Sequence, residues 1–134
     1  MKIPETGHSG QWKFETDKSH SAVRYGNEGV DVIATPALIG MIELACHRLI
    51  LQVLEPGEAS VGVHVDCTHV RGAVIGLSVT VSACITEVAK NQITFEVSAL
   101  HGDIVLMQGR HTRAIVDLDR LKRGLVKPAA AMDT

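Results

Sequence analysis

Apolar residues surround most of the circumference of residues 36–54, and this is the strongest helix signal in the chain. Thr35 is a suitable N-cap, and Pro36 suits the first helical position because its missing N–H has no partner there. The Pro-Gly pair at residues 56–57 cannot continue a helix. A helix that is apolar nearly all round is a buried helix. One line of residues spaced three and four apart interrupts the apolar surface, and it consists of Pro36, Gly40, Glu43 and His47.

Residues 58–118 alternate between apolar and polar positions, which is the pattern of β-strands with one buried face. Short connections at residues 89–92 and 101–103 join consecutive strands, so the sheet is expected to be antiparallel. A first short strand is expected at residues 12–15, continuing through residues 22–25. The pattern predicts an α+β fold in which a curved sheet of about five strands wraps one long central helix.

The length of 134 residues fits a single domain, in which residues 1–10 and 122–134 are expected to be loose tails. One helix of this length cannot both cover a five-stranded sheet and have its own opposite face shielded from solvent. We therefore expect a homodimer, or a dimer of dimers. The net charge of −2 argues against a nucleic-acid partner, and the short basic run at residues 120–123 is interpreted as a solvated end.

Cysteine usage and the polar first ten residues bear on the compartment. The three cysteines are odd in number, none forms a C-x-x-C pair, and each lies in an apolar segment, so free thiols in a reducing compartment are expected. No signal peptide is recognised, which predicts a cytoplasmic location. No apolar run is judged long enough to cross a bilayer, so no membrane partner is expected.

Glu43 is the only ionisable residue between residues 33 and 46. A carboxylate costs several kcal/mol to desolvate unless it is paired or hydrogen-bonded. The segment is therefore either a core helix with one wet edge, where Glu43 forms an i, i+4 ion pair with His47, or the floor of a reaction site. The pattern of this segment alone leaves both interpretations open.

Three segments resemble the fluoroacetyl-CoA thioesterase family of hotdog enzymes. They are Thr-Pro-Ala-Leu-Ile-Gly-Met-Ile-Glu-Leu-Ala-Cys-His-Arg at residues 35–48, Leu-Glu-Pro-Gly-Glu at residues 54–58, and Thr68-His69. The similarity extends over residues 21–118. It implies a hotdog fold and the hydrolysis of a small acyl-CoA thioester to free acid and coenzyme A.

The resemblance also implies a set of site residues. Thr35, Glu43 and His69 match the family's catalytic residues, and Gly62 and Arg113 match further residues of its site. The family enzyme has aromatic residues before the helix, whereas residues 26–33 here have none, so selectivity for a fluorinated acyl group does not follow.

The residues themselves are suited to thioester hydrolysis. Thr35 offers a hydroxyl at the helix start, where unpaired N–H groups can hold the negative charge of an oxyanion. Glu43 follows by about 12 Å of helical rise, so the two either share a site across a dimer interface or act on different parts of the substrate. By strand alternation His69 is expected on the same face as the apolar residues 61, 63, 65 and 67. Glu43 on the covering helix is a natural partner for its imidazole.

Each of these residues also has a purely structural interpretation. His69 can be a satisfied core histidine, Thr35 an ordinary N-cap, and Arg113 a charge on the sheet surface or at an interface. No metal site is expected, and no cofactor beyond the coenzyme A portion of the substrate. Two other functions stay open: a non-catalytic hotdog dimer that binds a ligand, and a dehydratase or hydratase that acts on an acyl thioester.

Overall fold

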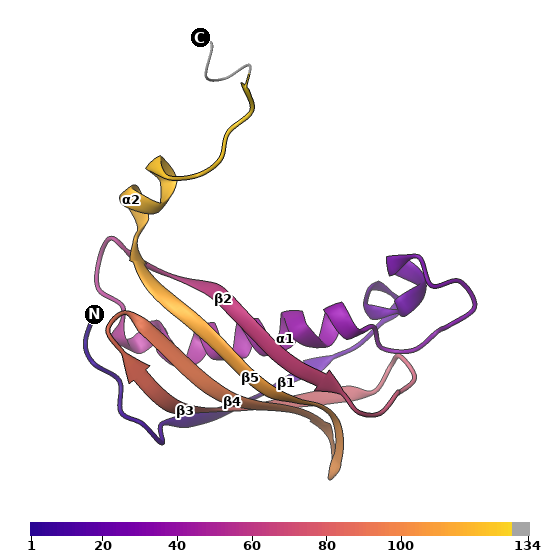
Figure 1. The fold of residues 1–134 in the computed structure, drawn as a ribbon. Coiled ribbons are helices and arrows are strands. Elements are labelled where there is room, and N and C mark those ends of the chain that lie inside the picture. The colour runs from indigo at the N-terminus through magenta and orange to yellow at the C-terminus, as the bar shows by residue number, and fades with distance from the viewer. Residues whose placement is uncertain (130–134) are drawn as a thin grey trace.

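Five antiparallel strands form one curved sheet that wraps around a central helix, α1 (Thr35–Ile50), as Figure 1 shows. The computed structural model describes residues 1–129. The strands are β1 (Ser9–Glu15), β2 (Glu58–His69), β3 (Ser78–Ala89), β4 (Gln92–His101) and β5 (Ile104–Asp117). Their order across the sheet is β1-β3-β4-β5-β2, so β1 and β2 are the two edges. The expected α+β fold with a five-stranded antiparallel sheet is confirmed.

The core lies between α1 and the inner face of the sheet. Helix α1 contacts all five strands, and its residues Leu38, Ile42 and Ile50 are completely buried. Phe95 and Met107 are equally buried on the facing strands β4 and β5. Burying one such side chain contributes roughly 1.5–3 kcal/mol, so this interface provides most of the driving force for folding. The apolar alternation along β3, β4 and β5 is therefore the inner face of the sheet.

The start of α1 differs from the expected one. Ala34 is the N-cap, because the first helical hydrogen bond runs from the N–H of Leu38 to the carbonyl of Ala34. Within residues 1–129 no side chain caps this end of the helix. Thr35 is therefore the first helical residue, and the prediction that it is the N-cap is wrong. Its hydroxyl is free to bond elsewhere. At the other end α1 continues into the 3₁₀ turn η3 (Leu51–Val53), close to the expected boundary at residue 54.

The expected continuation of the first strand through residues 22–25 is wrong. Two short 3₁₀ helices, η1 (Lys18–His20) and η2 (Ala22–Tyr25), occupy this region. The Asp17 carboxylate accepts from the N–H of Ser19 at 2.8 Å. The Ser21 hydroxyl accepts from the N–H of Val23 in η2 at 3.2 Å. Side chains of this kind favour caps and turns over strands because they bond to nearby backbone groups.

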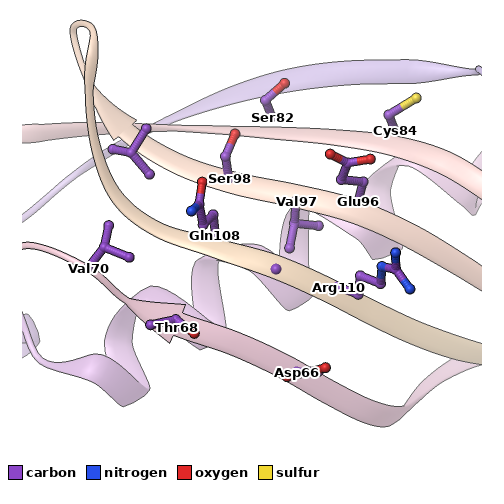
Figure 2. Close-up of a pocket in the computed structure, with 12 residues that line it drawn as sticks. Asp66, Thr68, Val70, Ser82, Cys84, Glu96, Val97, Ser98, Gln108 and Arg110 are labelled. Carbon is purple, nitrogen blue, oxygen red and sulfur yellow. The ribbon is translucent and has the colours of Figure 1, made fainter.

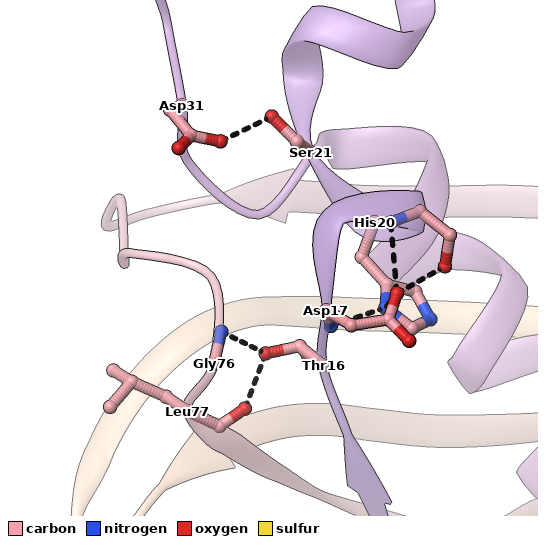
Figure 3. A network of polar contacts seen from close by, with 8 residues as sticks. Thr16, Asp17, His20, Ser21, Asp31, Gly76 and Leu77 are labelled. Carbon is pink, nitrogen blue, oxygen red and sulfur yellow. Dashed lines mark hydrogen bonds and ion pairs between the residues drawn. The ribbon is translucent and has the colours of Figure 1, made fainter.

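Polar contacts hold the segment before α1 against the loop between β2 and β3 (Figure 3). The Thr16 hydroxyl donates to the carbonyl of Leu77 at 2.6 Å and accepts from the N–H of Gly76 at 2.9 Å. Farther along, the Ser21 hydroxyl donates to Asp31 at 2.7 Å. These bonds fix the path of the chain into Thr35, beside the end of β2.

A β-bulge interrupts the alternation along β2. The pairing of β2 with β5 shifts between Gly62 and His64, so one residue is added to β2 at this point. Before the bulge Ser60 faces α1, whereas after it His69 does. The expectation that residues 61, 63, 65, 67 and 69 share one face is wrong across the bulge, because an extra residue exchanges the faces. The orientation expected for His69 towards the helix is nevertheless found.

The two ends of the chain are more ordered than expected. Ser9 and Gly10 belong to β1, and the N–H groups of Lys2 and Gly7 donate to the backbone carbonyls of Val53 and Ile85. At the other end the short helix α2 (Leu118–Arg123) includes the beginning of the expected tail, and it projects away from the sheet in Figure 1. Residues 130–134 of the expected tail lie outside the described residues.

The 19-residue segment Thr35–Val53 is long and apolar enough to cross a membrane by length and composition alone, with a mean hydropathy of 1.3 over an 18-residue window. This corrects the expectation that no apolar run reaches that length. In the structure the helix lies against the whole inner face of the sheet. We therefore interpret it as the core helix of the domain.

Candidate active site

Thr35 and His69 form a direct hydrogen bond at the beginning of α1. The Thr35 hydroxyl oxygen lies 2.7 Å from Nδ1 of His69, which is the last residue of β2. Thr35 is exposed and His69 is half-buried, so solvent and ligands can reach the pair. The distance is within the range for a hydroxyl nucleophile and the base that activates it. The first-turn N–H groups of α1 are close by, although Pro36 supplies none.

Glu43 and Arg113 form a second group, farther along α1. Nη1 of Arg113 lies 3.5 Å from Oε2 of Glu43, an ion pair whose acidic side chain is 43% exposed and whose basic side chain is 8% exposed. Arg113 also donates from Nε to the Ser60 hydroxyl at 2.6 Å and from Nη2 to the Ser60 carbonyl at 3.0 Å. The guanidinium is therefore fixed by Ser60, and it presents one edge to the carboxylate.

His111 supports Arg113 from the same strand. Nδ1 of His111 donates to the backbone carbonyl of His64 at 2.8 Å, so Nε2 is left to accept from Nη1 of Arg113 at 3.2 Å. Both bonds require the neutral imidazole. Burial, with the neighbouring Arg113 charge, lowers the pKa of His111. Burial also lowers the pKa of Arg113, while Glu43 opposes that shift.

Gly62 provides the space that this group occupies. A Cβ placed on Gly62 would lie 2.8 Å from Oε2 of Glu43, 3.2 Å from Cε1 of His111 and 3.5 Å from Nη1 of Arg113. The structure thus brings three predicted site residues, Gly62, Glu43 and Arg113, together in one place. Any side chain at Gly62 would compete with the carboxylate for the same volume.

Within one chain the expected pairing of Glu43 with His69 is not found. His69 bonds to Thr35, and Glu43 bonds to Arg113, so the predicted residues form two groups rather than one. Helical rise separates the groups by about 12 Å along α1. The structural interpretation of Glu43 is wrong, because among residues 1–129 no ion pair joins it to His47. Arg113 is 7% exposed, so it is not a charge on the sheet surface.

Ser60 and His111 are two further residues of this group that were not predicted, although the strand pattern contained a signal for each. His111 precedes Arg113 by two residues and Ser60 precedes Gly62 by two, so each shares a strand face with a predicted site residue. A polar residue at such a position within an apolar strand face indicates a partner nearby. The signal for Ser60 was hidden by the bulge in β2. Counted by simple alternation along the strand, Ser60 falls among the residues expected on the polar face.

Two cavities bear on the site. A small open cavity of about 290 Å³ is lined by Glu43, Leu44, His47, Ser60 and Arg113. A larger hollow of about 1020 Å³ lies on the opposite, outer face of the sheet. Figure 2 shows its polar side chains, among them Glu96 and Arg110. None of the five predicted site residues lines the larger hollow, so we place the candidate site at the smaller cavity and at the Thr35–His69 pair.

The cysteines and the acidic residues suggest no other centre in the part of the chain that the structure describes. Cys46, Cys67 and Cys84 are free thiols. Burial raises the pKa of Cys46 to about 12, so its thiol is a poor nucleophile although Arg113 is near. Within residues 1–129 no three His, Cys, Asp or Glu side chains are grouped so that they could hold a metal ion.

Comparisons with known proteins extend these observations. The family model described as the fluoroacetyl-CoA-specific thioesterase matches residues 16–119. The fluoroacetyl-CoA thioesterase of Streptantibioticus cattleyicolor is 37% identical over 90 residues, which cover 67% of this chain and 65% of that protein. The match therefore spans slightly less than two thirds of that relative.

Solved structures show the same architecture. A mutant of the fluoroacetyl-CoA-specific thioesterase FlK in complex with fluoroacetate and CoA has a TM-score of 0.83 at 30% identity, over 88% of this chain and 99% of its own. Another FlK mutant, in complex with acetyl-CoA, has a TM-score of 0.85 at 27% identity, over 98% and 99%. A Thermus thermophilus member of the thioesterase superfamily reaches 0.84 at 25% identity, over 92% and 91%.

Proposed function

Because this chain belongs to the family of fluoroacetyl-CoA-specific thioesterases, we propose that it hydrolyses a small acyl-CoA thioester to the free acid and coenzyme A. The observation that carries the proposal is the 2.7 Å contact between the Thr35 hydroxyl and His69 at the start of α1. This contact supports the assignment of a nucleophile and a base at the start of the helix, where first-turn N–H groups have no partner within the helix. Related structures bound to fluoroacetate with CoA, and to acetyl-CoA, support a small acyl group.

The proposed chemistry needs only this chain's residues and water. A hydroxyl, either that of Thr35 or of a water that Thr35 positions, attacks the thioester carbonyl carbon and loses its proton to His69 or Glu43. The carbonyl electron pair moves to the oxygen, where helical N–H groups stabilise it. When the carbonyl reforms, the C–S bond breaks and the sulfur of coenzyme A takes up a proton. If Thr35 itself attacked, water then hydrolyses the acyl-threonine ester.

We assign the second group to the same reaction. Arg113, held by Ser60 and His111, fixes the orientation of the Glu43 carboxylate while leaving it accessible to a ligand. An oriented but partly exposed carboxylate is suited to act as general base or general acid. Gly62 contributes by the absence of a side chain.

The separation of the two groups supports a homodimer in which each site combines residues of both copies. Strand β2 is an edge of the sheet, and its Val63 and Val65 are 50% and 39% exposed. Such an edge favours pairing with another strand. If β2 pairs with its own copy about a two-fold axis, the end of one β2 lies beside the start of the other. The Thr35–His69 pair of a second copy then approaches Glu43.

Thiol release from a panel of acyl-CoA thioesters tests the activity. We expect Glu43→Gln and His69→Ala each to lower kcat by about a hundredfold or more, the usual contribution of a general acid or base. The exposed His8, beside β1 at the opposite edge of the sheet from β2, provides a matched control as His8→Ala. Wild-type rates in both site variants, or no thiol release by the wild type across the panel, would contradict the proposal.

Mixing the two inactive variants tests the shared site. When Glu43→Gln and His69→Ala chains are refolded together, half of the dimers contain one chain of each kind. If each site takes Glu43 from one copy and His69 from the other, every mixed dimer has one intact site, and about a quarter of wild-type activity returns. No recovery would show that both residues act within one chain. The mass in solution separates a monomer, a dimer and a dimer of dimers.

We also propose a reducing, cytoplasmic location. Three thiols without a disulfide support it, since cysteines in oxidising compartments usually pair. Fluorescence imaging of the tagged chain in its source cells tests the location.

A further inference from the structure

His47 lies one helical turn after Glu43 and borders the same small cavity, and the proposed chemistry does not use it. Its Nδ1 atom is buried and has no hydrogen-bond partner among residues 1–129. A buried polar atom without a partner is uncommon in a folded protein, and it restricts what the rest of the ring can do. The arrangement of the two ring nitrogens therefore indicates how His47 meets a ligand.

The buried Nδ1 determines where the ring carries its proton. A neutral imidazole has one N–H, either at Nδ1 or at Nε2. A proton on Nδ1 would be a buried donor without an acceptor, which is rarer in proteins than an acceptor that lacks a donor. The favoured form therefore has a bare Nδ1 and an N–H at Nε2. Because Nδ1 is inaccessible, Nε2 is the nitrogen through which the ring can meet a ligand in the cavity.

The surroundings of His47 keep it neutral. Burial and the positive charge of Arg113 both lower its pKa. Glu43, the acidic neighbour on the same face of α1, forms its ion pair with Arg113 instead. His47 is thus a neutral donor beside a carboxylate acceptor, about 6 Å apart along the helix axis.

Resting on the proposed thioesterase function, we propose that His47 determines acyl specificity by donating a hydrogen bond from Nε2 to an oxygen of the acyl group. The preferred substrates are short acyl-CoA thioesters with a hydroxyl or keto oxygen close to the thioester carbon, over alkanoyl-CoA thioesters of the same size. Four of the five N–H groups of Arg113 already bond to Ser60, Glu43 and His111, so we assign the contact to the N–H at Nε2 of His47. The distance of one turn from Glu43 places the recognised oxygen near the reacting carbonyl.

The test compares hydroxyacetyl-CoA with propionyl-CoA, which differ by a hydroxyl in place of a methyl group. The ratio of their kcat/KM values is measured in the wild type and in His47→Leu, so that the different intrinsic reactivities of the two thioesters cancel between proteins. We expect the ratio to fall at least about fivefold in His47→Leu, the effect of one hydrogen bond in a partly hydrated site. His47→Gln can place an amide N–H near the position of Nε2, and it should restore the preference. His8→Leu, at an exposed histidine beside β1, should leave the ratio unchanged.

Two kinetic results would overturn the proposal. One is an unchanged ratio in His47→Leu. The other is restoration by His47→Asn, whose amide lies near the position of Nδ1, without restoration by His47→Gln. Nitrogen-15 NMR of the imidazoles in the free protein provides a test that needs no activity: we expect His47 at neutral pH to be protonated at Nε2 only, and any other state contradicts the inference. Absence of thiol release by the wild type would count against the thioesterase function, while the NMR result would still decide the state of His47.

Discussion

Replacing Gly62 by alanine should reduce activity strongly while leaving the fold nearly unchanged. The added Cβ would lie 2.8 Å from Oε2 of Glu43, whereas an ordinary contact requires about 3.5 Å. The carboxylate must therefore move by about 0.7 Å. Because Arg113 and Glu43 are already 3.5 Å apart, a shift of this size breaks their hydrogen bond.

In Gly62→Ala the expected loss of activity is much larger than the expected change in the free energy of unfolding. A catalytic group displaced by about 1 Å can cost a hundredfold in rate, so we expect kcat to fall between about tenfold and a hundredfold. The ion pair joins a partly exposed carboxylate to a buried guanidinium that keeps its bonds to Ser60 and His111, so we expect its loss to cost about 1 kcal/mol of stability. Gly62 does not have a positive φ, so alanine is not strained there, and it stiffens the unfolded chain in favour of folding by roughly 0.4–1 kcal/mol. The two effects nearly cancel.

Thiol release and denaturant unfolding, measured on the same preparations, check this prediction. Gly124→Ala is the matched control, because a Cβ there meets only ordinary contacts at 3.7 Å, and neither property should change much. Full activity in a stably folded Gly62→Ala variant would refute the argument that the site depends on where the Glu43 carboxylate lies. A loss of activity that merely follows unfolding would refute it as well.

Further substitutions and the pH dependence of stability test other parts of the structure. Thr35→Val removes the bond to His69 but no helix cap, so we expect thiol release to fall at least about tenfold and the free energy of unfolding to change by less than about 1 kcal/mol. Gly109→Ala should lower the unfolding free energy by about 3 kcal/mol, because the residue has φ of 155° and its Cβ would overlap the carbonyl of Asp66. The pKa of His111 is lowered in the folded state, so the unfolded chain binds the proton first, and the stability that this histidine provides is present above about pH 6.5 and lost as the pH falls. Urea unfolding between pH 7 and pH 5 should show this loss, and His111→Gln should reduce it.

The helix and the strand segments could be predicted from the sequence because both patterns are local. A residue that repeats every three or four positions, or every two, must lie on one face of its element whatever the rest of the chain does. The nearly all-round apolar surface of α1 follows from this periodicity. The end of the helix before Pro56 follows from the Pro-Gly pair. The antiparallel order of β3, β4 and β5 follows from the short connections between them. The candidate residues Thr35, Glu43 and His69 came from a resemblance in motif, and the structure places each of them in a polar contact.

The partners of those residues depended on the tertiary structure. Glu43 pairs with Arg113, 70 residues away, and His69 pairs with Thr35, 34 residues away, so no local pattern could select them. The bulge after Gly62 adds one residue to β2, and a single added residue exchanges the two faces of a strand without altering its composition. Local periodicity determined which segments are helix and strand, whereas the register between distant strands decided which side chains meet, because that register exists only once the sheet has closed around the helix.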